Sequence, residues 1–208
     1  MATTTQTIPQ SLIYEEFGGR AYYRKGYRKV LLGLKTEGEI MGSSFLQGLM
    51  IQALVHFLKN LLPKKQFWVP TNEVGLHLRK NVNFSGDILI CEKSKSPHPW
   101  TDTYTSVPPK FIIEVDVKID AKAENEEEGG TEADYILQKS QELLTFGVEG
   151  IVWILTKSRQ ILVIRTHKNV EVYAWSESVP LFENYTFCLQ QILEDEEILP
   201  NDKGFGSI

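Results

Sequence analysis

The sequence contains little cysteine and no long apolar run. Only two cysteines, Cys91 and Cys188, occur in 208 residues, which excludes a disulfide framework as the basis of the fold. Two isolated thiols are typical of a reducing compartment. No apolar stretch reaches the roughly 20 residues that a membrane-spanning helix needs, and the polar N-terminus lacks a signal-peptide pattern. We therefore expect a cytoplasmic protein without a membrane segment.

Several common catalytic and binding patterns are also missing. The four histidines have no metal-ligand spacing and no Cys-x-x-Cys accompanies them, which argues against a zinc site. The paired glycines at 129–130 lie in an acidic run, where a phosphate would be repelled. There is no Gly-x-Ser-x-Gly elbow, so the usual serine-hydrolase site is excluded as well. The remaining candidates for chemistry are carboxylates.

The length and composition fit one soluble globular domain. The chain is 42% hydrophobic and 24% charged, and 208 residues can bury a substantial core. We expect residues 1–13 to form a flexible arm and residues 14–208 to form a single domain. The net charge of −5 argues against a protein that binds nucleic acid over its whole surface, but it leaves room for a local basic site.

One segment is basic and contains no acidic residue. Residues 20–29 place arginines and lysines among three tyrosines. We expect Arg24, Lys25, Arg28 and Lys29 to bind backbone phosphates of a nucleic acid, a contact that carries no sequence information by itself. A basic surface hairpin without such a role is the alternative. The acidic run at 123–134 reads as a mobile loop.

Hydrophobic periodicity predicts an α/β (α+β) fold with a mixed sheet flanked by helices. Apolar residues at helical spacing over 43–62, between a capping serine and Pro63, predict a helix. Similar reasoning gives the other elements. They are helices at 132–147 and 185–195 and strands at 66–70, 74–80, 86–92, 110–120, 150–156, 160–166 and 171–175.

A row of charges follows one face of the strand predicted at 110–120. Glu114, Asp116 and Lys118 alternate with apolar residues, so they would project from the same face. Asp87 begins the apolar run of another predicted strand and can stand beside Glu114. Oxygen ligands without histidine or cysteine select Mg²⁺ or Mn²⁺. A salt-bridged polar sheet face is the alternative, although clustered acids repel one another unless a cation lies among them.

The spacing of Asp87 from Asp116-Val117-Lys118 resembles the Asp…(Asp/Glu)-x-Lys pattern of the PD-(D/E)xK nuclease superfamily. From about residue 20 to 175 the chain resembles the Uma-two family of bacterial putative restriction endonucleases. The resemblance implies a restriction-endonuclease-like core. The segments that carry it, in chain order, are GEIMGSSFLQGLMIQALVHFL, SGDILI, PPKFIIEVDVKID and YILQKSQELLTFGVEGIVWIL.

The resemblance also implies site residues. Asp87 and Glu114 correspond to the metal ligands, and Lys139, eight residues before Gly147, takes the place of the family's helical lysine. This chain departs from the family pattern because Lys118 restores the strand lysine, so two lysines compete for one role. The alternative for Lys139 is a solvated helix residue.

Two further residues are candidates for the same site. Asp116 would be a third acid or would hold a water molecule. Gln47, on the first predicted helix, would face the site from across the sheet edge, or would lie on the outer face of the helix.

The function that these features imply is Mg²⁺- or Mn²⁺-dependent hydrolysis of DNA phosphodiester bonds. Nucleases of this type cut both strands of a duplex by pairing two subunits, so double-stranded DNA and a homodimer are expected. Two alternatives stay open. One is a catalytically inactive member of the same fold that binds nucleic acid or a protein. The other is a glycosidase with paired carboxylates, which would give the lysine no role.

Overall fold

The computed structural model describes residues 8–96, 101–120 and 131–199. The chain divides into two compact units, which we call unit 1 (residues 1–42 and 117–139) and unit 2 (residues 43–116 and 140–208). The expectation of a single domain stays a prediction, because compact units need not fold separately. Helix α3 (Glu132–Phe146) contributes residues to both units.

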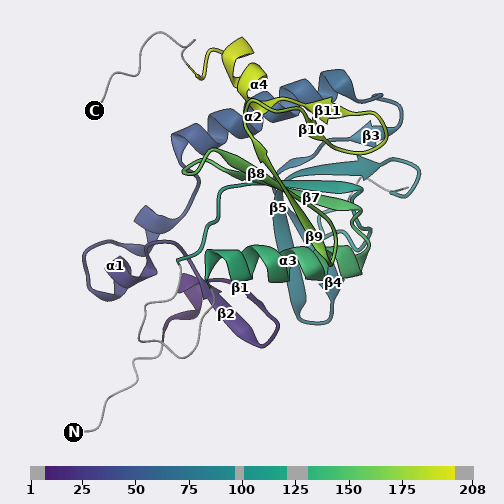
Figure 1. Cartoon of the computed structure of the whole chain (residues 1–208). Helices are drawn as coiled ribbons and strands as arrows, with labels where there is room; N and C mark the ends of the chain where they lie inside the picture. Colours follow the sequence, from purple (N-terminus) through teal and green to yellow (C-terminus); the bar gives the residue numbers. More distant parts are fainter. Residues whose placement is uncertain (1–7, 97–100, 121–130, 200–208) are drawn as a thin grey trace, which may run out of the picture. The chain divides into compact units, whose positions relative to one another are not determined.

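Unit 2 is built on a seven-stranded mixed sheet. The path runs β3-β5-β6-β7-β8-β9, and β4 also pairs with β5. β6 and β7 are parallel, and the other neighbours are antiparallel. The strands are β3 (Phe67–Trp68), β4 (Thr71–Arg79), β5 (Val82–Glu92), β6 (Phe111–Val115), β7 (Gly150–Leu155), β8 (Gln160–Thr166) and β9 (Asn169–Ala174) (Figure 1).

Helices contact both faces of this sheet. Along β7, Val152 and Ile154 join the main hydrophobic core with α2 (Phe45–Leu61) and α4 (Leu189–Asp195), and α2 and α4 lie side by side in Figure 1. Trp153 points to the other face, where its Nε1 donates a 3.0 Å hydrogen bond to Ser140 Oγ of α3. Side chains alternate between the two faces of a strand, and the all-apolar β7 is suited to burial on both.

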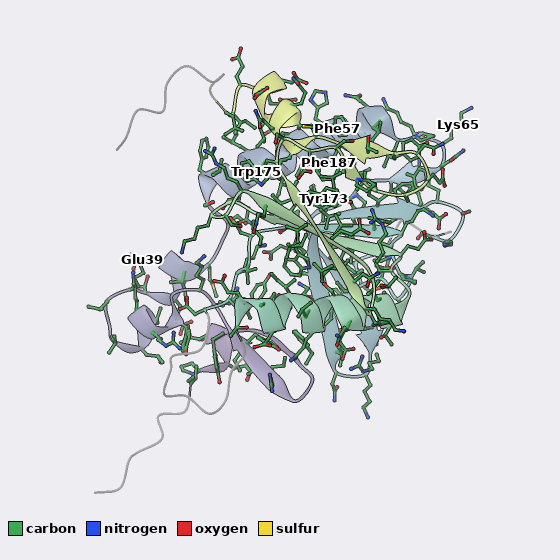
Figure 2. All side chains as sticks on the ribbon, viewed as in Figure 1. Glu39, Phe57, Lys65, Tyr173, Trp175 and Phe187 are labelled. Atoms are coloured by element: carbon green, nitrogen blue, oxygen red, sulfur yellow. The ribbon has the colours of Figure 1, made fainter. Side chains whose placement is uncertain are left out.

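Aromatic residues belong to the main core or pack against it. Trp175 and Phe187 are buried members of it, whereas Phe57 and Tyr173 are partly buried and pack against it (Figure 2). Phe187 ends the short strand β11 (Thr186–Phe187), which pairs with β10 (Val179–Pro180). The predicted closing helix at 185–195 therefore begins later than expected, at Leu189.

The first turn of α2 is held by a serine cap. Ser44 Oγ accepts a 3.2 Å hydrogen bond from the backbone N–H of Gln47, which satisfies one of the donors that the start of a helix leaves without an intrahelical acceptor. At the other end, the N–H of Leu62 still bonds to Leu58 and Pro63 follows. The helix predicted at 43–62 is thus confirmed, with both end signals in place.

Replacing the cap is expected to weaken unit 2 measurably. Ser44→Ala should lower the free energy of unfolding by about 1 kcal/mol, the usual cost of losing a serine N-cap. Urea denaturation measures the change, and Ser43→Ala is the matched control because Ser43 is an exposed neighbour outside the cap. The control should lie within about 0.5 kcal/mol of the parent protein. Equal effects of the two substitutions would contradict the capping role.

Unit 1 contains a hairpin that the sequence analysis did not predict. β1 (Ile13–Phe17) and β2 (Arg20–Tyr23) pair antiparallel around Gly18 and Gly19. Both glycines have positive φ, 60° and 73°, as a two-residue type I′ turn requires. The remaining helical elements of this unit before α3 are η1 (Gln10–Leu12), α1 (Tyr27–Leu31) and η2 (Glu37–Ile40).

The strand predicted over 110–120 is wrong in its second half. β6 ends at Val115, and Asp116 has a left-handed backbone with φ 60°. The carbonyl of Lys118 accepts a hydrogen bond from Lys25 N, and the N–H of Asp120 donates to Tyr23 in unit 1. Asp116 and Lys118 therefore do not continue the Glu114 face of one strand, because the chain changes direction at Asp116.

The other predicted elements are confirmed with small shifts in their ends. Residues 121–130, which include most of the predicted acidic loop, lie outside the described residues. Leu12, inside the predicted arm, is buried. In the described part of the chain, no helix has the length and apolar character needed to cross a bilayer.

Candidate functional site

Asp87 of β5 and Glu114 of β6 lie opposite each other on neighbouring strands. The two strands pair Ile88 with Ile113 and Leu89 with Ile112, and this register, continued by one residue, places Asp87 across from Glu114. Such cross-strand partners have Cβ atoms about 5 Å apart and point to the same face. Both carboxylates are buried, at 3% and 4% relative exposure. The two acids thus lie beside each other, as expected, and their binding of a metal ion stays a prediction.

Asp87 is held at the end of β6 by two donors. Its Oδ2 accepts a 2.9 Å hydrogen bond from Val115 N and a 3.4 Å hydrogen bond from Gln47 Nε2. Gln47 Nε2 also donates to the carbonyl of Val115 at 2.7 Å. Two donors fix the orientation of the carboxylate and offset part of the cost of burying its charge.

Gln47 lies inside, beside Asp87, and not on the outer face of α2. It is the third residue of the helix after its Ser44 cap, where a glutamine commonly bonds back to the cap as part of a capping box. Its side chain is 5% exposed and donates to Asp87 and Val115. The start of α2 is thereby tied to the edge of β5 and β6 that carries the acids.

Asp116 forms hydrogen bonds with residues at the end of β7. Its backbone N–H donates to Ile154 at 2.8 Å, and its carboxylate accepts from both the N–H and the hydroxyl of Thr156 at 2.7–2.8 Å. An aspartate tolerates the left-handed backbone better than most residues, and the Thr156 contacts hold it there. These contacts give Asp116 a structural task whether or not it also serves a metal ion.

The donor set fits a hard divalent cation. The predicted ligands Asp87 and Glu114 are both carboxylates, and no cysteine or histidine is predicted beside them. Mg²⁺ is commonly bound through one or two carboxylates, with waters and substrate phosphates completing its coordination shell. Among residues 8–96, 101–120 and 131–199, no three His, Cys, Asp or Glu side chains form a group able to hold one metal ion. The metal-ligand set of Asp87, Glu114 and Asp116 stays a prediction.

Lys139 is buried in unit 1, so the solvated-helix alternative is wrong. The side chain is 1% exposed. Its Nζ lies 3.0 Å from Glu15 Oε1 and 3.3 Å from Tyr135 OH, and Tyr135 OH donates to Glu15 Oε2 at 2.7 Å. These charge-assisted hydrogen bonds restrict the position of the ammonium. Lys118, by contrast, is half-buried and takes part in the pairing with Lys25 through its carbonyl.

Three residues of these arrangements escaped the sequence analysis. Tyr135 is four residues before Lys139, so helical spacing places the two on one face. Glu15 lies between Ile13 and Phe17 at strand spacing, which signals an inward-facing acid. No sequence pattern indicated Thr156, because it contacts Asp116 only through the position of the end of β7 in the folded chain.

The predicted phosphate-binding residues are divided between β2's end and α1. Arg24 donates from Nε to the carbonyl of Ser11 at 3.2 Å and lies over the ring of Tyr14, and Arg28 lies over the ring of Tyr27. Lys25 and Lys29 are exposed. A single surface hairpin does not describe the segment, since 27–31 is helical. Its binding role stays a prediction.

Neither cysteine forms a disulfide. Burial raises the pKa of the Cys91 thiol to about 11, so this thiol stays protonated at neutral pH, and only the thiolate is a good nucleophile or metal ligand. Cys188 is the N-cap residue of α4.

A structural comparison supports the fold. No family model matches the chain, and a search of curated proteins gave no match. Among solved structures, the chain is similar to the 1.96 Å crystal structure of "a putative nuclease belonging to DUF820" from Anabaena variabilis ATCC 29413, with a TM-score of 0.61. The alignment covers 86% of this chain and 89% of the other at 12% sequence identity. The chain therefore has a restriction-endonuclease-like fold, with a mixed sheet flanked by helices.

Proposed function

We propose that this protein is a nuclease that hydrolyses DNA phosphodiester bonds with the help of Mg²⁺ or Mn²⁺. The observation that carries the proposal is the buried pair Asp87 and Glu114 on adjacent strands, with Asp87 oriented by Gln47 and Val115. Burial of two acids on one face is costly without donors or a cation. The nuclease description of the structural neighbour and the resemblance to the Uma-two family support the same activity.

Asp87 and Glu114 would hold the cation. When bound, the cation would lower the pKa of a coordinated water and neutralise charge on the phosphodiester. Gln47 would keep Asp87 in the rotamer that faces Glu114, because its amide donates to both Asp87 and the Val115 carbonyl. Asp116 would be a weaker third ligand of the cation, since Thr156 already donates hydrogen bonds to its carboxylate.

These contacts do not distinguish Lys118 from Lys139 as the catalytic lysine. Lys118 and Lys139 belong to unit 1, and Asp87 and Glu114 belong to unit 2. We favour Lys139, because Glu15 and Tyr135 hold its ammonium in one place, and catalytic groups need such fixed positions. The group would position the attacking water or stabilise charge on the phosphoryl group.

The substrate and the assembly form part of the same proposal. Double-stranded DNA would contact Arg24, Lys25, Arg28 and Lys29 through its phosphates, a contact that weakens with salt. A homodimer would present one site to each strand. Double-stranded DNA and the homodimer follow from the resemblance to restriction endonucleases, and the four phosphate-binding residues follow from the basic composition of residues 20–29.

One alternative function is supported by a specific observation. No three-ligand metal group exists among the described residues, and Asp116 and Lys139 already have hydrogen-bonding partners. An inactive member of the fold that binds nucleic acid or a protein would be consistent with these contacts, since fold alone does not fix function.

Cleavage of supercoiled plasmid tests the proposal. We expect nicked and linear products with Mg²⁺ or Mn²⁺ and none with EDTA. Lys139→Ala and Lys118→Ala are compared, with Lys168→Ala as the control because Lys168 is exposed in the turn between β8 and β9. Loss of cleavage with Lys139→Ala alone supports the helical lysine, provided that urea denaturation shows this variant to be folded, and loss with Lys118→Ala alone supports the strand lysine. A wild-type protein that cleaves no DNA with either metal ion contradicts the proposal.

A further inference from the structure

Unit 2 contains a basic pocket far along α2 from the acids. It has a volume of about 450 Å³, a size typical of small-molecule sites. The walls come from the end of α2, the turn before β3, β3 itself and the residue that follows β5. Its lining residues are His56, Lys59, Asn60, Leu62, Lys64, Phe67, Trp68, Val69 and Lys93.

The charge of the lining is opposite to that of the whole chain. The chain has a net charge of −5, yet the pocket is lined by three lysines and by no aspartate or glutamate. Where the chain is described, no salt bridge joins Lys59, Lys64 or Lys93 to a carboxylate. His56 is the exception among the basic groups, because its Nδ1 lies 2.8 Å from Glu196 Oε1 at the rim. Three uncompensated ammonium groups around a hollow attract an anion.

Lys93 is held in place by neutral groups. Its Nζ donates a 2.5 Å hydrogen bond to the carbonyl of Lys64 and lies 5.3 Å from the centre of the Trp68 ring. Neither contact cancels its charge, and both restrict its position. Trp68 is half-buried, with its β3 backbone paired to Cys91 of β5. An anion that reaches Lys93 would therefore lie beside an aromatic ring fixed by the sheet.

The pocket is distinct from the candidate metal site. Lys59 follows Gln47 by 12 residues on the same helix, which corresponds to about 18 Å along the axis. Gln47 contacts Asp87, whereas Lys59 lines the pocket. A ligand of the pocket is therefore not held by the carboxylates.

We propose that this pocket binds a nucleoside phosphate, with the phosphate among Lys59, Lys64 and Lys93 and the base against Trp68. Lysine is a common phosphate ligand, and stacking on an aromatic ring accepts any base. Asn60 at the wall offers both a donor and an acceptor to the base edge. The same chemistry is presented by a free nucleotide and by one residue of a nucleic-acid strand. The proposal does not rest on the nuclease activity.

Calorimetry at low salt in EDTA tests the pocket with adenosine 5′-monophosphate, adenosine, inorganic phosphate and an octamer of deoxyadenylate. We expect the monophosphate to bind at least about tenfold more tightly than adenosine, because the nucleoside lacks the phosphate. Lys93→Ala should weaken binding about tenfold. Lys168→Ala, which removes the same charge outside the lining, should leave binding unchanged.

Tryptophan fluorescence gives a second readout. Binding should quench part of the emission, and Trp68→Phe should abolish that quenching while keeping binding within a few-fold, since phenylalanine also stacks. Thermal melting checks that the variants fold, and Lys59→Ala and Lys64→Ala are the reserve variants because both side chains are exposed.

The outcomes distinguish a free nucleotide from a nucleic-acid strand as the ligand, and they can also exclude both. An octamer that binds no more tightly than the monophosphate supports a free nucleotide, and one that binds more tightly supports a strand. If the monophosphate and the octamer both fail to bind, or if Lys168→Ala weakens them as much as Lys93→Ala does, the pocket is not a nucleoside phosphate site. Because the assay contains no divalent ion, these outcomes are independent of whether the protein cleaves DNA.

Discussion

Asp87→Asn and Glu114→Gln are each expected to lower the rate of metal-dependent plasmid cleavage at least about a thousandfold. A factor of this size corresponds to about 4 kcal/mol in the activation barrier. Both substitutions keep the shape of the side chain but remove the negative charge that would hold a divalent cation. Because the two acids lie opposite each other on β5 and β6, neither should be able to replace the other.

Two controls and a binding measurement accompany these variants. Asp195→Asn and Glu183→Gln make the same chemical changes at exposed positions and should leave cleavage within about twofold of the parent. Calorimetry with Mn²⁺ should show weaker binding for the two site variants, and urea denaturation should show that they remain folded. Cleavage that survives either Asp87→Asn or Glu114→Gln would show that the pair is not the metal site.

Local periodicity was sufficient to predict most of the fold. The helix at 43–62 and the strands around Asp87 and Glu114 have patterns that short-range physics determines, such as an apolar stripe with a serine cap or an unbroken apolar run. The predicted fold class is confirmed for that reason. The hairpin from Ile13 to Tyr23 was missed because its strands are short and carry charges at inward positions, such as Glu15.

The strand predicted at 110–120 shows what periodicity cannot reveal. Alternation continues through Val117 and Ile119, and both are buried, but they belong to unit 1 and follow the end of β6. Only the positive φ of Asp116 separates the two environments. Aspartate is one of the few residues that enter this conformation readily, so its place in an otherwise regular strand was the available signal.

The candidate site was predictable in part. Asp87 begins an apolar run and Glu114 stands within one, and neighbouring strands bring such residues together. The sequence left two positions open for Gln47, one facing the site and one on the outer face of the helix. Its contact with Asp87 shows that it faces the site. The Glu15 partner of Lys139 lies 124 residues away in sequence, and no local pattern links two residues so far apart.

Breaking the buried pair of unit 1 should be strongly destabilising. Glu15→Ala is expected to lower the free energy of unfolding by about 3–5 kcal/mol, because it removes the carboxylate that lies 3.0 Å from the buried ammonium of Lys139. The pair is 1% and 6% exposed on its two side chains, so water cannot take the place of the lost partner. Glu16→Ala is the matched control, since Glu16 is the exposed neighbour on β1, and it should cost less than about 0.5 kcal/mol.

Replacing both charges distinguishes two contributions to the free energy of unfolding. One is the penalty of a buried ion that has lost its partner, and the other is the net stabilisation by the ion pair. The double substitution Glu15→Leu with Lys139→Met removes both charges and keeps apolar volume, so it should cost much less than Glu15→Ala, and it can even be stabilising. Urea denaturation of Glu15→Leu, Lys139→Met and the double variant gives the coupling energy. A Glu15→Ala variant as stable as Glu16→Ala would show that Lys139 is not confined by Glu15. A double variant that is stable but cleaves no DNA is the outcome expected if Lys139 is the lysine of the site, because the loss of cleavage then cannot be ascribed to unfolding.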